Sequence, residues 1–134
     1  MICKLRPACK SHIWGGRRLI EEYGKGDGAG NLAESWELSC HPDGPSIAAD
    51  GPYAGGSLPE ILAERPEFAG RAVESLGRFP VLVKLIDAAR DLSVQVHPDD
   101  AYALKHEGQL GKTEMWYIID AEPGAGLTDV FTGG

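Results

Sequence analysis

The sequence predicts a mainly β fold with a few short helices. The 18 glycines and 9 prolines favour frequent turns, and therefore short strands over long helices. Apolar and polar side chains alternate over residues 33–39, 92–97 and 114–119, which is the two-residue period of a half-buried strand. Residues 79–88 form a continuous apolar run that is interrupted by Lys84 and is typical of a buried strand. We interpret Lys84 as an edge residue whose amine reaches solvent, the alternative being a buried cation near a functional site.

The composition is that of a soluble globular protein with one domain over residues 1–134. Hydrophobic residues make up 43% and charged residues 25% of the chain, which is long enough for a real core. The net charge of −7 argues against nucleic acid or an anionic membrane surface as a partner. No apolar run reaches membrane-spanning length, and the first residues lack the apolar core of a signal peptide. Cys3, Cys9 and Cys40 have no disulfide spacing, so we expect free thiols in a cytoplasmic protein.

Three short helices are predicted. Residues 57–60, Ser-Leu-Pro-Glu, form a capping box with proline in the first turn, and predict a helix that ends near residue 64. Residues 67–76 are expected to add a second helix. Residues 99–107 predict a third, which begins after Asp99 and is stopped by Gly108.

Turns are expected at three further places. Residues 41–44, His-Pro-Asp-Gly, and the glycine- and proline-rich residues 50–56 and 122–126 predict turns, and residues 127–131 predict a last strand. The glycine-dense residues 24–31 fit neither a dinucleotide-binding nor a P-loop spacing, and are expected to form a surface loop.

Gln95, His97 and Glu114 form a candidate metal site. Side chains two apart on a strand share a face, so Gln95 and His97 are expected to point the same way, and Glu114 opens the next strand pattern. An amide oxygen, an imidazole and a carboxylate suit a divalent ion such as zinc, and three protein ligands with an open position are typical of a catalytic site. The alternative is three solvated polar side chains, because this spacing does not identify a zinc site by itself.

Two motifs carry a resemblance to a known family. Residues 93–100 read Ser-Val-Gln-Val-His-Pro-Asp-Asp, and residues 111–117 read Gly-Lys-Thr-Glu-Met-Trp-Tyr. Together they resemble the zinc-binding core of the type I mannose-6-phosphate isomerases, also called phosphomannose isomerases. Upstream, the resemblance continues in order through residues 14–16, 34–37, 51–53 and 79–88. It implies a cupin, jelly-roll β-sandwich, present here as an incomplete, N-terminal part of the domain.

The resemblance also implies a function. Enzymes of this family interconvert mannose 6-phosphate and fructose 6-phosphate through a cis-enediol, with zinc acting on the sugar oxygens. By match to the family motifs, Gln95, His97 and Glu114 are expected as zinc ligands, and Ser93 as a hydroxyl near the substrate phosphate. Lys112 matches a lysine beside the site, where an ammonium steadies an oxyanion or passes a proton. The alternative for Lys112 is an ordinary surface lysine in a loop.

One departure from the family pattern leaves three hypotheses open. Family members are longer and carry, further downstream, another zinc-ligand histidine and an arginine essential for turnover, neither of which has a counterpart here. The favoured hypothesis is a fragment, or one gene half, of a zinc-dependent sugar-phosphate isomerase that is active only with the rest present. Its exposed edges are then expected to lead to self-association or to pairing with a missing C-terminal half. The second is a non-catalytic cupin-like module that binds metal or sugar. The third is a metal-independent folded remnant.

Overall fold

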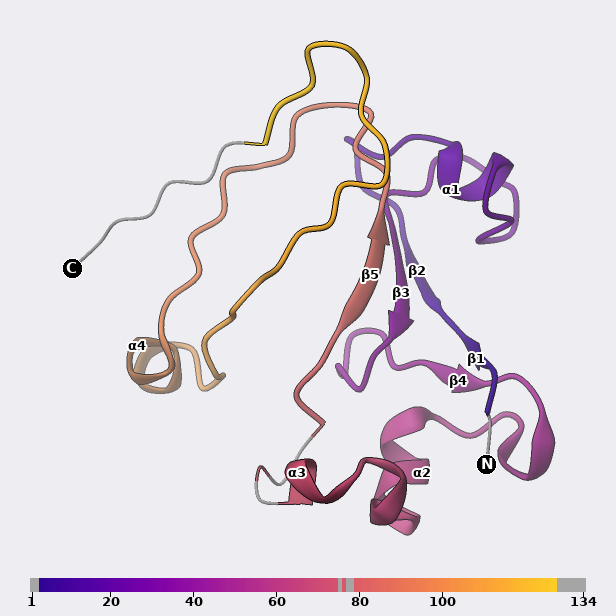
Figure 1. Cartoon of the computed structure of the whole chain (residues 1–134), viewed down its shortest axis with the longest axis vertical. Coiled ribbons are helices and arrows are strands. Elements are labelled where there is room, and N and C mark those ends of the chain that lie inside the picture. The colour runs from indigo at the N-terminus through magenta and orange to yellow at the C-terminus, as the bar shows by residue number, and fades with distance from the viewer. Residues whose placement is uncertain (1–2, 75, 77–78, 128–134) are drawn as a thin grey trace. The chain divides into compact units, whose positions relative to one another are not determined.

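The computed structural model describes residues 3–74, 76 and 79–127 of the chain (Figure 1). The contacts divide the chain into two compact units, Met1–Ser93 and Val94–Gly134. The first unit holds all of the strands that the structure describes.

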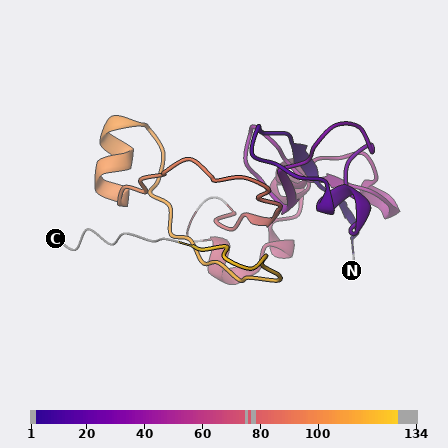
Figure 2. The same cartoon turned by 90° about the horizontal axis from the view of Figure 1, so that it is seen from above.

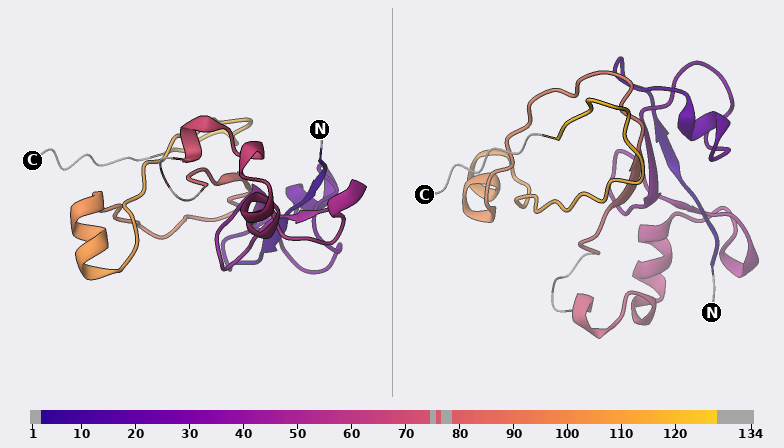
Figure 3. Two further views of the ribbon diagram at one scale, coloured as in Figure 1. Left: turned by 90° about the horizontal axis from the view of Figure 1, so that it is seen from below. Right: turned by 45° about the horizontal axis from the view of Figure 1, so that its top comes forward.

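The main sheet of the first unit has three antiparallel strands (Figures 1 and 3). In spatial order these are β2 (Ala8–Lys10), β3 (Glu34–Leu38) and β5 (Val83–Ile86). The strand predicted over residues 33–39 is confirmed as β3, which is paired on both edges. Ser35 is fully buried and lies opposite Cys9 on one neighbour and Leu85 on the other. The centre of this unit therefore lies along β3.

The strand β5 is shorter and more exposed than the sequence predicts. A single buried strand is expected over residues 79–88, but β5 covers Val83–Ile86, and the side chain of its first residue, Val83, is exposed. The prediction of a buried strand is wrong for the start of this run, because β5, among the described residues, is paired with β3 on one side only. The pairing register also shifts between Trp36 and Leu38, close to where the ladder ends.

A second, two-stranded sheet joins the start of the chain to a later segment. The strands β1 (Leu5–Arg6) and β4 (Ile47–Ala48) pair antiparallel. The turn predicted at residues 41–44, between β3 and β4, is confirmed by a hydrogen bond of 3.0 Å from the amide of Gly44 to the carbonyl of His41. Such a bond closes a four-residue turn and returns the chain towards β1.

Short helices connect the strands of the first unit. They are α1 (Arg18–Glu21), η1 (Gly51–Tyr53), α2 (Leu58–Glu64), η2 (Pro66–Phe68) and α3 (Arg71–Glu74). The predicted capping box is confirmed: Ser57 Oγ accepts a hydrogen bond from the Glu60 amide at 3.4 Å, and Glu60 Oε2 accepts one from the Ser57 amide at 3.0 Å. The single helix predicted over residues 67–76 is wrong, because Gly70 adopts a left-handed φ of 82° and separates η2 from α3.

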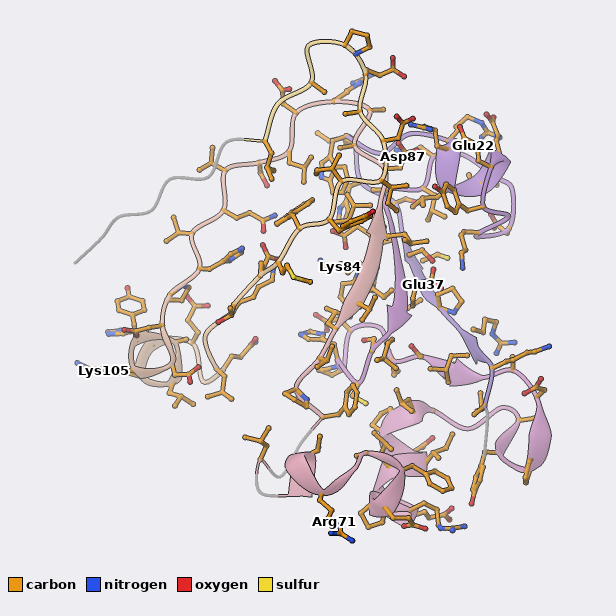
Figure 4. The ribbon with its side chains drawn as sticks, viewed as in Figure 1. Glu22, Glu37, Arg71, Lys84, Asp87 and Lys105 are labelled. Carbon is orange, nitrogen blue, oxygen red and sulfur yellow. The ribbon has the colours of Figure 1, made fainter. Side chains whose placement is uncertain are left out.

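Two adjacent glycines allow segments of the first unit to approach closely. A Cβ atom at Gly15 would lie 2.6 Å from Cβ of Ala33, and one at Gly16 would lie 2.5 Å from Oδ2 of Asp87. The same oxygen of Asp87, labelled in Figure 4, accepts a hydrogen bond of 2.7 Å from the amide of Arg18, the first residue of α1. The end of β5 and the start of α1 are thereby held together.

Several expectations concern the surface of the molecule. Residues 24–31 form a surface loop, as predicted. The three cysteines, Cys3, Cys9 and Cys40, are free thiols, also as predicted. None of the helices in the described part of the chain has the length and apolar character needed to cross a membrane.

The second unit contains α4 (Asp100–His106) between two irregular segments (Figure 2). The predicted cap is confirmed, because Asp99 Oδ1 accepts a hydrogen bond of 2.8 Å from the amide of Tyr102. Gly108 follows the helix with a φ of 66°, the conformation that commonly ends a helix.

The strands predicted over residues 92–97 and 114–119 are wrong. Neither segment is part of a strand, and Val96 and Met115 are strongly exposed. A strand requires backbone hydrogen bonds to a neighbouring strand. Within the described ranges, residues 92–97 and 114–119 form no backbone hydrogen bond with another segment. The alternation is present in the sequence, but the partner that would make it a ladder is not among the described residues.

The end of the second unit is described as far as Leu127. The turn predicted at residues 122–126 is confirmed by a hydrogen bond of 2.9 Å from the Ala125 amide to the Glu122 carbonyl. The strand predicted over residues 127–131 falls outside the described residues after its first position.

Candidate functional site

His97 and Glu114 are in direct contact within the second unit. The imidazole Nε2 of His97 lies 2.7 Å from Oε2 of Glu114, although 17 positions separate the two residues in the sequence. Both side chains are partly buried. The proximity that the sequence predicts for these two donor groups is therefore confirmed.

Local contacts around α4 explain how these residues meet. The amide of Gly111 donates a hydrogen bond of 2.9 Å to Oδ1 of Asp100, the first residue of α4. Gly111 also packs on the backbone before the helix, since a Cβ there would lie 2.5 Å from the carbonyl oxygen of Pro98. The segment that leaves α4 is thus attached to the segment that enters it. This attachment brings Glu114 back to His97.

Lys112 completes a three-residue cluster. Its ammonium forms an ion pair with Oε1 of Glu114, the oxygen that does not face His97. Partial burial acts to raise the pKa of Glu114, but the hydrogen bonds and charges of Lys112 and His97 outweigh it, so that the pKa lies below its ordinary value. Glu114 is therefore an ionised carboxylate at neutral pH, with a cation on one oxygen and an imidazole on the other.

The other two predicted site residues have no such contacts. The side chain of Gln95 is exposed, and the described residues show no hydrogen bond between it and His97 or Glu114. Ser93 is also exposed and is the last residue of the first unit. Their roles as a metal ligand and a phosphate contact remain predictions. No group of three or more histidine, cysteine, aspartate or glutamate side chains that suits a metal ion occurs in the described part of the chain.

A buried ion pair in the first unit is a site that the sequence did not predict. Glu34 on β3 is buried, and the ammonium of Lys84 on β5, labelled in Figure 4, lies 3.3 Å from its Oε1. The indole Nε1 of Trp36 donates a hydrogen bond of 2.7 Å to Oε2 of the same carboxylate. The ammonium of Lys84 also lies 5.3 Å from the centroid of the Trp36 ring, within cation–π distance.

This cluster corrects the interpretation of Lys84. The side chain is 19% exposed and paired, so it is a largely buried cation and not an edge residue whose amine reaches solvent. The signal was present in the sequence, because Glu34 and Trp36 are two apart and share a face of β3. Lys84 lies directly opposite Trp36 in the register, which the sequence of β5 does not reveal.

Comparison with known proteins identifies the family. The model of the phosphomannose isomerase type I catalytic domain matches residues 2–123. This chain belongs to the type I phosphomannose isomerase family. It is 50% identical over 113 residues to a mannose-6-phosphate isomerase of Streptococcus mutans, a match that covers 84% of this chain and 35% of the relative. It is 42% identical over 121 residues to the mannose-6-phosphate isomerase ManA of Bacillus subtilis, covering 90% of this chain and 38% of that relative.

Solved structures confirm the fold. The crystal structure of a mannose 6-phosphate isomerase from Bacillus subtilis matches with a TM-score of 0.82 and 47% identity, over 90% of this chain and 38% of that one. A phosphomannose isomerase variant from Salmonella typhimurium matches with a TM-score of 0.66 and 27% identity, over 80% of this chain and 29% of that one. The predicted cupin-type β fold is therefore confirmed. The chain spans little more than a third of the length of the curated relatives named above.

Proposed function

We propose that this chain supplies the N-terminal part of a zinc-dependent site that interconverts mannose 6-phosphate and fructose 6-phosphate. Membership of the family supports the reaction class. The observation that carries the proposal is the cluster of His97, Glu114 and Lys112, in which an imidazole and an ammonium share one ionised carboxylate. Because the chain spans about a third of its relatives, the residues described here form one part of the proposed site.

The geometry of His97 and Glu114 fits a zinc ion. Zinc binds imidazole nitrogen and carboxylate oxygen at about 2.0–2.1 Å, so two such ligands of a tetrahedral ion lie about 3.3 Å apart. The observed separation of 2.7 Å between Nε2 and Oε2 is that of a direct hydrogen bond, so zinc binding requires the two atoms to move apart by about 0.6 Å, through a small rotation of the side chains. Lys112 contacts the other carboxylate oxygen and leaves Oε2 available. Gln95 is the third ligand in this proposal, by its match to the family motif.

The remaining residues contribute proton transfer and substrate binding. When bound, zinc would stabilise the negative charge that develops on the sugar oxygens as a proton moves between C1 and C2. The ammonium of Lys112, held by Glu114, is a donor that can stabilise an oxyanion or pass a proton to it. The hydroxyl of Ser93 is proposed as a hydrogen-bond donor to the phosphate. Glu114, whose pKa lies below its ordinary value, is deprotonated at neutral pH, as metal binding requires.

Zinc content tests this proposal directly. The full chain is incubated with zinc, freed of unbound metal and measured by mass spectrometry. We expect close to one equivalent of zinc in the wild type and its loss in His97→Ala. The matched control is His106→Ala, which removes a histidine at the end of the neighbouring helix α4. Equal zinc content in the two variants would contradict the assignment of His97.

A further inference from the structure

The glycine-rich residues 24–31 of the first unit are attached to the rest of that unit near their two ends. We call residues 24–31 the strap. At its start, the amide of Lys25 donates a hydrogen bond of 2.9 Å to the carbonyl of Leu19. At its end, the side-chain amide of Asn31 donates hydrogen bonds to two backbone carbonyls that precede α1. Among the described residues, 26–29 form no backbone hydrogen bond with another segment, so the middle of the strap follows its ends.

The backbone of the strap is one that loses much freedom when it is ordered. Every second residue is a glycine with a left-handed φ: 63° at Gly24, 72° at Gly26, 86° at Gly28 and 61° at Gly30. Glycine loses more conformational entropy on ordering than any other residue. A specific contact is therefore needed to hold the strap in this one position.

Lys25 supplies that contact. Among residues 24–30 it is the one whose side chain is not exposed, and its ammonium lies 2.9 Å from Oε2 of Glu37 on β3, which is labelled in Figure 4. Both side chains are largely buried, at 24% and 26% exposed. The hydroxyl of the fully buried Ser35 donates a hydrogen bond of 2.7 Å to the other carboxylate oxygen. Because Glu37 is already oriented, this pair loses less side-chain freedom than an ordinary surface ion pair does.

The strap forms one side of a cavity of about 290 Å³. Gly26 and Asp27 line the cavity from the strap, while Cys9 of β2 and Leu32 line it from the body of the unit. Leu32 is 4% exposed, and a Cβ atom at Gly26 would lie 3.3 Å from its Cδ2. Movement of the strap away from Leu32 would therefore widen the cavity.

We propose that the strap is a hinged cover, which the ion pair between Lys25 and Glu37 holds closed over this cavity. When the pair separates, the glycine backbone gains entropy and the strap moves away from Leu32. The cavity is then open to small solutes. The cover lies entirely within the first unit, so it does not depend on the zinc site proposed for His97 and Glu114.

Hydrogen–deuterium exchange of backbone amides, followed by NMR, tests the proposal. Glu37→Gln removes the charge but keeps an oxygen that accepts the hydrogen bond of Ser35. We expect the amides of Lys25 and Leu32 to exchange at least about fivefold faster in the variant, and that of Ile61 in α2 to change little. Unchanged exchange at Lys25 overturns the proposal. Equal acceleration at Ile61 also overturns it, because the pair would then stabilise the whole unit and not the strap.

A neighbouring ion pair provides the matched control. Glu22→Gln makes the same chemical change in the pair of Arg18 and Glu22, which also has a separation of 2.9 Å but is 42% and 50% exposed. We expect it to change exchange at Lys25 by less than about twofold. Equal effects of Glu37→Gln and Glu22→Gln would contradict a specific role of Glu37.

Salt distinguishes the charge from the shape of the side chain. At an ionic strength of about 1 M, charges are screened within a few ångströms, so the Lys25 amide of the wild type should exchange faster. In Glu37→Gln the same salt should have little further effect. Equal salt dependence in the two proteins would show that the ion pair does not hold the strap.

The reactivity of Cys9 shows whether the strap controls access to the cavity. Alkylation by iodoacetamide is followed by mass spectrometry of peptides, with the exposed thiol of Cys3, which does not line the cavity, as the internal reference. We expect the rate at Cys9 relative to Cys3 to rise about threefold in Glu37→Gln. Faster amide exchange without this rise would mean that the strap moves but covers nothing, and would overturn the proposal.

Discussion

The carboxylate of Glu114 contacts two neighbouring side chains, each through a different oxygen. Lys112 occupies Oε1, while Oε2 faces the imidazole of His97. If a zinc ion binds, His97 exchanges this hydrogen bond for a bond to the metal, while the ion pair with Lys112 can persist. The two neighbours therefore have different roles in the proposed site: His97 would be the metal donor, and Lys112 is a cation that acts to lower the pKa of Glu114.

The ligands are expected to differ in strength. His97→Ala should remove zinc from the chain more completely than Gln95→Ala, because imidazole is a better zinc donor than an amide oxygen. Zinc content after dialysis against a weak chelator measures the difference. Equal retention of zinc by the two variants would count against Gln95 and His97 as members of one ligand set.

A close approach at Gly15 gives a second prediction for a single residue. Gly15→Ala introduces a Cβ atom 2.6 Å from Cβ of the buried residue Ala33 and 2.7 Å from its backbone nitrogen. We expect a loss of about 1–3 kcal/mol in the free energy of unfolding, as for other overpacked sites. Urea denaturation followed by tryptophan fluorescence measures this loss.

The control for this prediction is another glycine. At Gly126 a Cβ atom would meet nothing within 4 Å, and the φ angle is not positive. Gly126→Ala should therefore change the free energy of unfolding by less than about 0.5 kcal/mol. A Gly15→Ala variant as stable as Gly126→Ala would show that the first unit relaxes around the added methyl group.

Among the helices, α2 depends on its capping box. Ser57→Ala removes the side-chain oxygen that accepts a hydrogen bond from the Glu60 amide, and should destabilise the first unit by about 1 kcal/mol. The hydrogen bonds from Ser57 lower the pKa of Glu60. A carboxylate with a lowered pKa stabilises the fold above its unfolded pKa and loses that contribution as the pH falls.

The effect of Ser57→Ala should consequently depend on pH. The difference in unfolding free energy between wild type and variant should be larger at pH 7 than below the ordinary glutamate pKa of about 4.3. Urea denaturation at the two pH values measures it. The same difference at both values would mean that Glu60 does not contribute through its charge.

Most of the elements that the sequence predicts correctly are determined by neighbouring residues, and the exception is β3, which is paired on both edges. The capping box at Ser57, the Asp99 cap and the turn closed by Gly44 each depend on contacts over a few positions. The strands predicted over residues 92–97 and 114–119 depend on distant partners, and they are wrong. Alternation indicates which face of a strand is buried once it is paired, but it does not supply the pairing.

In the candidate sites, too, contacts set by local structure are predictable from the sequence, whereas contacts set by long-range strand pairing are not. The contact between His97 and Glu114 is predictable from the motifs, because α4 and its caps are local and bring the two residues together. The buried pair of Glu34 and Lys84 is not, because it depends on the register between β3 and β5. Long-range register is fixed by the packing of the whole sheet, and a single sequence does not state it.

For the whole chain, we expect no turnover of mannose 6-phosphate by this polypeptide alone. It spans 38% of the Bacillus subtilis relative, and of the predicted site residues only His97, Glu114 and Lys112 are in contact with one another. A coupled assay of fructose 6-phosphate formation measures turnover with and without the downstream part of that isomerase attached. Clear activity of the isolated chain would show that the residues described here suffice for turnover, and would contradict this expectation.

The attachment of Gly111 to both sides of the start of α4 has a consequence for how much variation this region tolerates. The amide of Gly111 donates a hydrogen bond to Asp100, and Gly111 packs against the backbone of Pro98. Residues 98–111 therefore form a closed loop around α4, which we call the ring, and its two ends are held together. Substitutions on the outward face of the ring leave the distance between imidazole and carboxylate unchanged. An insertion of one residue between Gly111 and Glu114 lies outside the ring, and would turn the carboxylate away from its partner.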